Sequence, residues 1–210
     1  MNSHFSEPFP PTPNYQRLAQ PSLEGRTARL RVIQPEDYRF LYWLETNPAN
    51  AFRWRHRGST PGPEEAIRTF WQGMLCAYIV ESTESSRPEG LAIAFNLDER
   101  NRHCHIGVLG RPDRDGGGIN PALEGTIILI QHLFEVWQFR KLYAEVLEYN
   151  YDQFQHATGP IAIEEGRLRD HDWMFGRYWD KIVLAIYRDD WERNHQGSAA
   201  RFLGRSEREG

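Results

Sequence analysis

The residues with the clearest chemical potential in this sequence lie between Ile106 and Asn150. The pattern there predicts a strand, a turn with three consecutive glycines at residues 116–118, a long helix over residues 121–137, and another strand over residues 142–147. The first N–H groups of a helix lack partners within the helix and carry the positive end of its dipole. Because glycine has no Cβ, a phosphate can approach such donors closely. The order therefore indicates an anion-binding strand–loop–helix unit.

The glycine run by itself is also compatible with an ordinary flexible turn. The two common nucleotide-binding motifs are absent: there is no Gly-x-Gly-x-x-Gly followed by an acid about 20 residues later, and no Gly-Lys-Ser/Thr. Binding of a nucleotide through either of these motifs is therefore disfavoured.

Length and composition narrow the class of protein. The chain has 210 residues, which suits a single domain of ordinary size with a substantial core. Its net charge is −4 and its basic residues form no polybasic arm, so nucleic acid and membrane are not expected partners. No run approaches the roughly 18 apolar residues of a membrane span, and the N-terminal segment lacks the apolar region of a signal peptide.

The cysteines bear on metal binding and on redox compartment. Cys76 and Cys104 fall inside predicted strands and form no cluster with metal-ligand spacing. We therefore expect no bound metal, and a reduced, cytoplasmic protein rather than a secreted one.

The predicted elements form one mixed α/β domain over residues 23–191, between a Pro-rich leader at residues 1–22 and a polar tail at residues 192–210. Helices are predicted from Pro35 and over residues 64–74, 121–137 and 151–158. Strands are predicted over residues 26–33, 76–82, 90–97, 103–109, 142–147, 161–168 and 181–187. Short polar turns join the strands between residues 76 and 109, which predicts a meander. From Asp189 onward we expect a loose chain.

The chain carries six short motifs in order: LEGRTARLRVIQPEDY, LDERNRHCHIG, GGGINPALEG, KLYAEVLEYN, EGRLR and GRYWD. Together they resemble the GCN5-related N-acetyltransferases (the GNAT superfamily), especially the branch acting on ribosomal-protein N termini and amino-sugars. LEGRTARLRVIQPEDY resembles the opening strand and helix of the family, and LDERNRHCHIG resembles its turn into the fourth strand. GGGINPALEG resembles the acetyl-CoA loop and helix, and KLYAEVLEYN resembles the fifth strand with its terminal Asn. EGRLR and GRYWD resemble the closing hairpin, so the resemblance covers residues 23–191.

The resemblance implies an α/β fold of the GNAT type: a mixed central sheet of six to seven strands, flanked by about four helices and splayed between the fourth and fifth strands. In that fold the pantetheine arm of acetyl-CoA, or of another acyl-CoA, pairs with the fourth strand, and the pyrophosphate binds at the start of the long helix. Asn150 is expected to contact the pantetheine, to cap the next helix, or to do both. The residues expected at the cofactor are Ile106, Val108, Leu109, Arg114, Gly116, Gly117, Gly118, Ile119, Asn120, Ala122 and Asn150.

The sequence departs from the family pattern in two places. The family loop is usually Arg/Gln-x-x-Gly-x-Gly/Ala, but here Asp115 stands at the basic position and Asn120 at the second glycine. Arg114 compensates only if the loop is shifted by one residue, so weaker affinity or an unusual acyl donor is an alternative. Ala157 stands where many relatives carry a Tyr that protonates the departing thiolate. His156, beside that position, is a candidate acid, and the alternative is a histidine on the surface of a helix.

His105 is the candidate general base. The family often has Glu just before Ile-Gly on the fourth strand, and this chain has His105 there. A histidine with a pKa of about 6.5 suits the removal of a proton from an ammonium group. The alternative is that His105 is a strand histidine on the opposite face or is hydrogen-bonded in the core. His103 lies on the same face of the predicted strand as His105 and is a substitute candidate for the base.

By analogy with the family, the loop that contains Arg53, Trp54 and Arg55 borders the acceptor site. Its arginines favour an acceptor with a carboxylate, phosphate or nucleotide-sugar group, although arginines in a solvated loop are the alternative. Asp98 and Glu148 are candidates for binding the cation of the acceptor, against the alternative of solvated acids at strand ends.

The resemblance therefore predicts an enzyme that moves an acetyl or related acyl group from acyl-CoA to a primary amine of a small-molecule biosynthetic intermediate, such as an amino-sugar. Direct attack in a ternary complex is the usual route of the family. Two alternatives remain: the same fold with a carrier-protein or aminoacyl donor, and a non-catalytic acyl-CoA-binding protein. Dimers are frequent among related proteins, so a homodimer is a further expectation.

Overall fold

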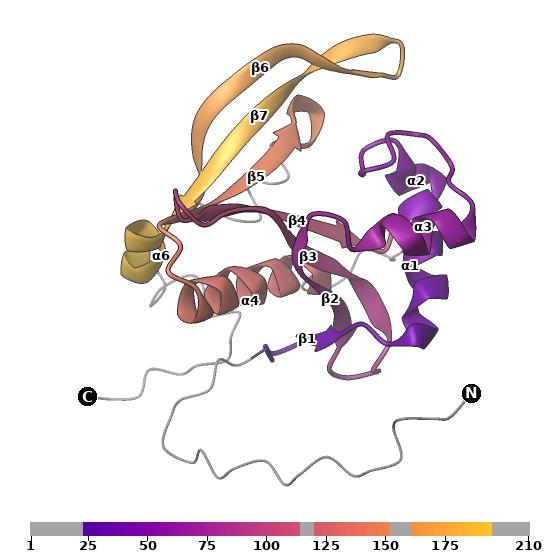
Figure 1. Cartoon of the computed structure of the whole chain (residues 1–210), viewed down its shortest axis with the longest axis horizontal. Coiled ribbons are helices and arrows are strands. Elements are labelled where there is room, and N and C mark those ends of the chain that lie inside the picture. The colour runs from indigo at the N-terminus through magenta and orange to yellow at the C-terminus, as the bar shows by residue number, and fades with distance from the viewer. Residues whose placement is uncertain (1–22, 114–119, 152–160, 195–210) are drawn as a thin grey trace, which may run out of the picture.

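The computed structural model describes residues 23–113, 120–151 and 161–194, which form a mixed seven-stranded sheet with helices packed against it (Figure 1). The strand order is β1-β2-β3-β4-β5-β7-β6. The strands are β1 (Ala28–Val32), β2 (Met74–Ser82), β3 (Pro88–Asp98), β4 (His103–Gly110), β5 (Lys141–Leu147), β6 (Ile163–Met174) and β7 (Arg177–Tyr187). The helices are α1 (Tyr38–Thr46), α2 (Pro48–Ala51), α3 (Pro63–Phe70), α4 (Pro121–Val136) and α6 (Arg188–Asn194), with 3-10 turns η1 (Pro35–Asp37) and η2 (Glu148–Asn150).

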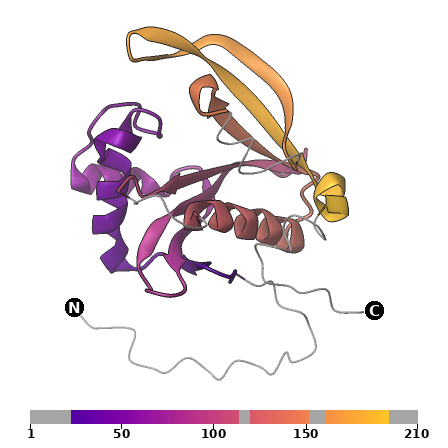
Figure 2. The same ribbon diagram turned by 180° about the vertical axis from the view of Figure 1, so that it is seen from behind.

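The first four strands form the predicted meander, because each pairs antiparallel with the next along the chain. Helix α4 then carries the chain across one face of the sheet to β5, which runs parallel to β4 (Figure 2). Strand β7 pairs antiparallel with β5, and β6 forms the outer edge. The predicted fold class is confirmed.

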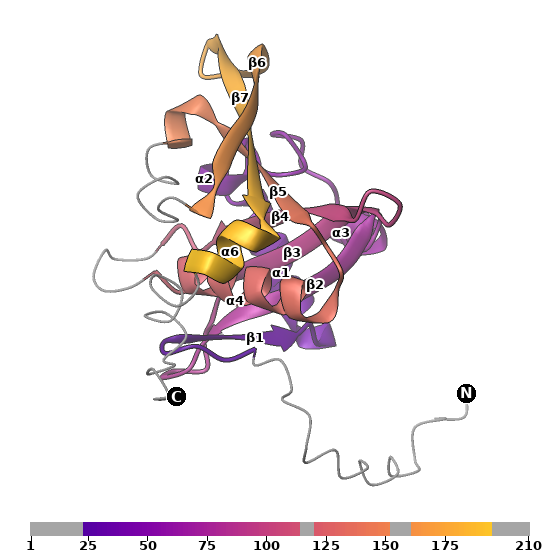
Figure 3. The ribbon, with the colours of Figure 1, turned by 90° about the vertical axis from the view of Figure 1, so that its left-hand side faces the viewer.

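Strands β4 and β5 are joined only at their beginnings. Three residue pairs connect them, from His103–Lys141 to His105–Tyr143. Beyond these pairs β4 stays with β3 as far as Gly110, whereas β5 stays with β7 as far as Leu147. The β6–β7 hairpin carries β5 away from β4 and projects beyond the rest of the sheet (Figure 3). The predicted splay between the fourth and fifth strands is confirmed.

Two hydrophobic clusters hold the sheet between its helices. The larger lies under α4 and is built on Ile127–Ile130, Leu133 and the inward residues of β4, β5 and β7. The smaller lies on the opposite face under α1 and α3, around Leu41, Leu44 and Phe70. Helix α4 approaches β2 closely at Gly125, where a Cβ would lie only 2.7 Å from Val80 Cγ2.

The C-terminal part of the described chain differs from the expectation of a loose segment beginning at Asp189. Helix α6 occupies Arg188–Asn194, and the indole of Trp191 is buried. Trp191 Nε1 donates to Gln131 Oε1 of α4 at 3.0 Å. A segment this polar contains only one large apolar anchor, so its pattern carried no helical periodicity to detect.

Other boundaries also moved. Helix α3 ends at Phe70 rather than near residue 74, because Gly73 has a φ of +71° and β2 begins at Met74. Strands β6 and β7 are longer than predicted, and helix α2 was not predicted. The predicted helix over residues 151–158 lies almost wholly outside the described residues, and Tyr151 directly follows η2. No helix among the described residues is long and apolar enough to cross a membrane.

A buried charge network joins the start of α1 to β1 and β2. Arg31 donates to both carboxylate oxygens of Asp37, at 2.7 and 2.9 Å. Arg31 and Arg29 also bind Glu81, which is 4% exposed. The hydrogen bonds from Arg31 hold the pKa of Asp37 below its usual range. Burial opposes the ionisation of Glu81, but the hydrogen bonds from Arg31 and Arg29 outweigh it and lower the pKa of Glu81 as well.

Glu81→Gln is expected to lower the free energy of unfolding by about 2 kcal/mol at neutral pH, because two guanidinium groups lose their buried charged acceptor. A carboxylate with a lowered pKa stabilises the fold above its unfolded pKa of about 4, and that contribution is lost as the pH falls through the lower folded pKa. The difference in the free energy of unfolding between the wild-type protein and the variant should therefore shrink at acidic pH, as measured by urea unfolding at neutral and at acidic pH. Glu84→Gln, in an exposed turn, is the control. An equal loss at both pH values would contradict this account.

Candidate functional site

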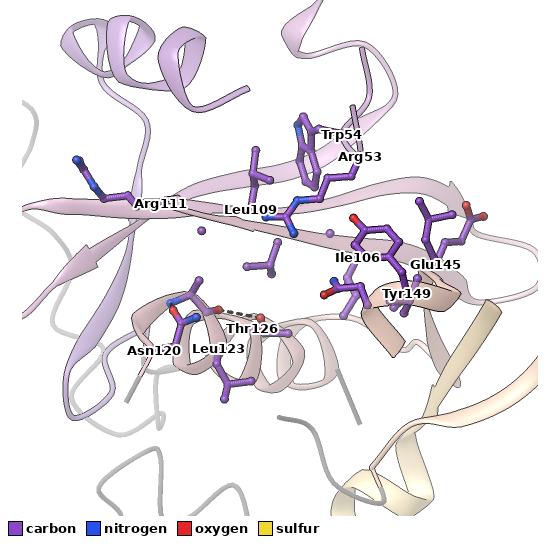
Figure 4. Close-up of a pocket in the computed structure, with 18 residues that line it drawn as sticks. Arg53, Trp54, Ile106, Leu109, Arg111, Asn120, Leu123, Thr126, Glu145 and Tyr149 are labelled. Carbon is purple, nitrogen blue, oxygen red and sulfur yellow. Dashed lines mark hydrogen bonds between the residues drawn. The ribbon is translucent and has the colours of Figure 1, made fainter. Parts of the chain in front are cut away.

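The gap between β4 and β5 is a cavity of about 400 Å³ (Figure 4). Residues 106–110 of β4 form one wall, and residues 144–147 of β5 form the other. The start of α4 closes one end, while Tyr149 and Asn150 of η2 and Arg53 and Trp54 from the loop after α2 complete the lining.

The edge of β4 inside this cavity is open. Beyond His105, β4 is paired only with β3 in the described part of the chain. The backbone N–H and C=O groups that point away from β3 therefore face the cavity, and they need hydrogen-bond partners from water or a ligand. An extended amide chain bound along such an edge adds the missing strand. Ile106, Val108 and Leu109, which the family resemblance places at the cofactor, all line the cavity.

The start of α4 offers fewer donors than the sequence suggests. Pro121 has no N–H, and Asn120 Oδ1 accepts from the Ala122 N–H at 3.0 Å. The N–H groups of Leu123 and Glu124 donate to the Asn120 carbonyl. The first turn of the helix is thus already hydrogen-bonded, so an anion would need donors from the preceding loop. The predicted residues of that loop, Arg114, Gly116, Gly117, Gly118 and Ile119, lie outside the described residues, and so does His156.

A buried glutamate fixes the loop after α2. Glu45, which is 2% exposed, accepts from Trp54 Nε1 at 3.0 Å, and its carboxylate also lies 3.1 Å from Arg55 Nε and 3.2 Å from His56 Nε2. Arg55 donates to the Phe70 carbonyl and lies over the Phe70 ring. Arg55 therefore holds the loop and lines neither of the cavities described here, contrary to its predicted place at the acceptor. Trp54 does line the cavity.

Arg53 points from the same loop into the cavity (Figure 4). Its Nη2 donates to Asn50 Oδ1 at 2.9 Å. Asn50 is fully buried, and its Nδ2 donates to the carbonyls of Leu44 and Gly110 at 3.0 and 3.3 Å. Asn50 therefore ties the arginine to both α1 and β4, a role that nothing in the sequence signalled.

His105 lies on the face of the sheet opposite α4, just outside the cavity lining. Its ring stacks on Tyr143 with centroids 5.3 Å apart, and it lies 5.6 Å from the Phe95 ring. Its Nε2 is 3.8 Å from Glu145 Oε1, and its buried Nδ1 has no partner within the described residues. Burial lowers the pKa of His105 below its ordinary value of 6.5, an effect that Glu145 partly opposes. His103 packs edge-on against the same Tyr143 ring and lies 3.7 Å from Asp98.

Glu145 connects the histidine to the cavity, and sequence reasoning missed it. It lies on β5 two residues beyond Tyr143, so the pairing of His105 with Tyr143 brings both side chains to one face. Lys181 Nζ lies 3.2 Å from Glu145 Oε2. The alternation of residues along the strand could have indicated which face Glu145 occupies, but not that His105 of β4 is its neighbour.

A second cavity of about 340 Å³ adjoins the first. The two share Arg53 and residues 145–147 of β5. The remaining lining comes from Phe52 and Arg57 of the loop after α2, from Asp172, Trp173 and Met174 of β6, and from Lys181 of β7. Arg57 pairs with Asp172, and Lys181 Nζ lies 3.5 Å from the same carboxylate. The first cavity thus opens at Glu145 toward a charged chamber under the hairpin.

Two predicted acceptor residues are not brought to either cavity. Asp98 is the last residue of β3, and its carboxylate accepts from the backbone and side chain of Asn101 in the following turn. Glu148 lies 3.7 Å from Arg167. Asn150 does line the first cavity, as does Tyr149, whose side chain points into it (Figure 4) and packs edge-on against Trp179.

The described residues contain no group of three or more His, Cys, Asp or Glu side chains placed to hold a metal ion. Both cysteines are free. Burial raises the pKa of Cys76 to about 11 and that of Cys104 to about 12, so neither is a thiolate at neutral pH.

No protein-family model matches this sequence, and no curated protein sequence matches it. Solved structures do resemble its fold. Spermidine N-acetyltransferase from Vibrio cholerae, in complex with CoA and spermine, superposes with a TM-score of 0.68 at 18% identity, covering 79% of this chain and 98% of that one. A GNAT-family acetyltransferase from Bacillus anthracis gives a TM-score of 0.64 at 14% identity, covering 80% and 98%. The chain therefore has the fold of the GNAT acetyltransferases.

Proposed function

We propose that this GNAT-fold chain is an acyl-CoA-dependent N-acetyltransferase that moves an acetyl or related acyl group to a primary amine of a small molecule, such as an amino-sugar, by direct attack in a ternary complex. One observation carries the proposal: the open edge of β4 lies in a cavity that meets a second cavity at Glu145. The Vibrio cholerae structure with CoA and spermine supports it, because this fold there binds both a coenzyme and an amine. The cytoplasmic location and the homodimer stay predictions.

The first cavity offers backbone partners for the pantetheine arm of an acyl-CoA donor but few free N–H groups for its diphosphate. The backbone of Ile106, Val108 and Leu109 can pair with the amides of a pantetheine arm, with Asn150 beside it. Bound acetyl-CoA would supply an acyl group activated as a thioester. A free N–H on the open β4 edge can polarise the acyl carbonyl as negative charge develops on its oxygen. The first turn of α4, however, has its own N–H groups already bonded through Asn120.

The acceptor amine must lose a proton before its nitrogen can bond to the acyl carbon. Glu145 lines both cavities, so its carboxylate can accept that proton. His105 lies behind it at 3.8 Å and is neutral at pH 7 because burial lowers its pKa. It can orient the carboxylate and take the proton onward. Tyr149 of η2, which directly follows β5 and also lines the first cavity, can donate its phenolic proton to the sulfur as the C–S bond breaks.

Glu145→Gln is expected to lower kcat/KM for acetyl transfer by about 10² to 10³, the usual contribution of a general base. The assay is the release of free CoA thiol with a panel of primary amines. In the wild-type protein, activity should fall only as the pH drops below 6.5, because the pKa of His105 lies below that value. His105→Gln should move this acidic limb, and Glu99→Gln, in the β3–β4 turn, should change nothing. Full activity in Glu145→Gln would reject this residue as the base.

Tyr149→Phe tests the proton donor. We expect kcat to fall by about 10²-fold with little change in KM, because the ring that packs on Trp179 stays and only the hydroxyl is removed. Tyr178→Phe, on an exposed tyrosine of β7, is the matched control. An unchanged kcat would show that the thiolate leaves without help from this phenol.

Asn120→Gly tests whether the Asn120 side chain, by accepting from the Ala122 N–H, weakens the binding of a diphosphate at the start of α4. The Ala122 N–H would become available to a diphosphate, so CoA should bind several-fold more tightly in isothermal titration. Glycine is tolerated at an N-cap, so stability should change by only a few tenths of a kcal/mol. Asn47→Gly removes the equivalent cap from α2 and should leave CoA affinity unchanged.

The hydrogen-bonded first turn of α4 is also what favours the two alternative functions, a carrier-protein or aminoacyl donor and a non-catalytic acyl-CoA-binding protein. If neither acetyl-CoA nor CoA bound to the wild-type chain, the acyl-CoA donor would be wrong. Binding without transfer to any amine would leave the non-catalytic protein.

A further inference from the structure

We propose that the acceptor carries a carboxylate or phosphate next to its primary amine, that Arg53 binds this anion, and that Glu145 binds the ammonium. This inference rests on the proposed acetyl transfer and names its substrate class. Its basis is the difference between Arg53 and the other cations around the second cavity.

Those other cations are already neutralised by carboxylates of the chain. Arg57 pairs with Asp172. Lys181, whose side chain is only 8% exposed, lies between Glu145 and Asp172 at 3.2 and 3.5 Å. Arg53 differs, because no carboxylate of the described segments lies within ion-pairing distance of its guanidinium. It is exposed, and it lines both cavities.

The guanidinium is also held in place. Asn50 Oδ1 accepts from Nη2 at 2.9 Å, and Asn50 is fully buried with its amide donating to carbonyls of α1 and β4. An arginine held in this way loses less conformational entropy when it binds an anion. Its remaining N–H donors can bind a carboxylate or a phosphate in a two-point contact. The site is thus formed before the ligand arrives.

The charge balance of the second cavity disfavours a polycation. Its lining carries three cations, from Arg53, Arg57 and Lys181, and two carboxylates, from Glu145 and Asp172. The lining therefore carries one cation more than it has carboxylates, so it has no excess of negative charge to attract a polycation. A polyamine would add several positive charges without a free carboxylate for each, and like charges in a partly buried site repel strongly. The spermine of the Vibrio cholerae structure is therefore a poor guide to the acceptor of this chain.

An amine with a neighbouring anion satisfies both residues at once. Arg53 and Glu145 each line both cavities, so they stand where the two chambers meet. The ammonium at Glu145 would lie beside the open edge of β4, where the acyl group is expected. Phe52 and Trp173 give the second cavity apolar surface for the carbon skeleton or sugar ring.

The test compares matched acceptors in the CoA-release assay. The first pair, glucosamine 6-phosphate and glucosamine, differs by a phosphate. The second pair, phenylalanine and phenylalaninamide, differs by a carboxylate. Spermidine serves as the polycation. For the wild-type chain, kcat/KM should be about 10- to 100-fold higher for the anionic member of at least one pair, the usual value of a charged hydrogen bond. Arg53→Gln should remove that preference mainly through KM, Arg53→Lys should keep part of it, and Arg53→Glu should shift it toward spermidine.

The control is Arg100→Gln, in the exposed turn between β3 and β4, which should keep both rate and preference. Thermal unfolding of each Arg53 variant shows that a loss of preference is not a loss of fold. Equal use of charged and uncharged acceptors, or a preference for spermidine, would overturn the inference while acetyl transfer stands. If the wild-type chain bound acetyl-CoA but acetylated no amine, the inference and the proposed function would both fail.

Discussion

The candidate site depends on one constraint: β4 and β5 share only three residue pairs. Each strand is committed to a different neighbour, β4 to β3 along its length and β5 to β7 along all of its own. Where the two part, the backbone of β4 keeps polar groups that the sheet does not satisfy. Buried or half-buried backbone groups require partners, so the gap offers a row of hydrogen-bonding groups that an extended amide chain can pair with.

The point where β4 and β5 separate also brings ionisable side chains together on the face of the sheet opposite α4. The last joined pair, His105 and Tyr143, lies directly before the gap, and Glu145 follows it on the same face of β5. The carboxylate is thereby held at the boundary between two cavities, with a histidine behind it and Lys181 beside it. That boundary is the place where the proposed acetyl transfer needs a proton acceptor.

The loop after α2 shows how burial sorts similar side chains into different roles. Glu45 is almost completely buried and attracts Arg55, which is then used to hold the loop against Phe70. Arg53, two residues earlier, is directed the other way and is held by the neutral amide of Asn50. A neutral partner leaves the arginine with its full charge for a ligand, whereas a carboxylate partner does not.

The sequence alone determined what depends on neighbours along the chain. The apolar pattern and the polar turns predicted the strands of the meander, and apolar residues at helical spacing after the glycine run predicted the helix that is α4. The order of the motifs carried a resemblance to the GNAT family, and that resemblance implied the fold and the splay. It also placed Ile106, Val108 and Leu109 at the cofactor and Arg53 and Trp54 beside the acceptor, and all five line the first cavity. Only the tertiary structure decided that Glu145 lies beside His105 and that Trp191 of α6 packs on α4. It also decided that Arg55 pairs with Glu45, whereas Arg53 is held by a neutral amide and keeps its charge for a ligand. The physical reason is that periodicity and capping are local properties, whereas strand register and the choice of charge partner are settled between segments far apart in the chain.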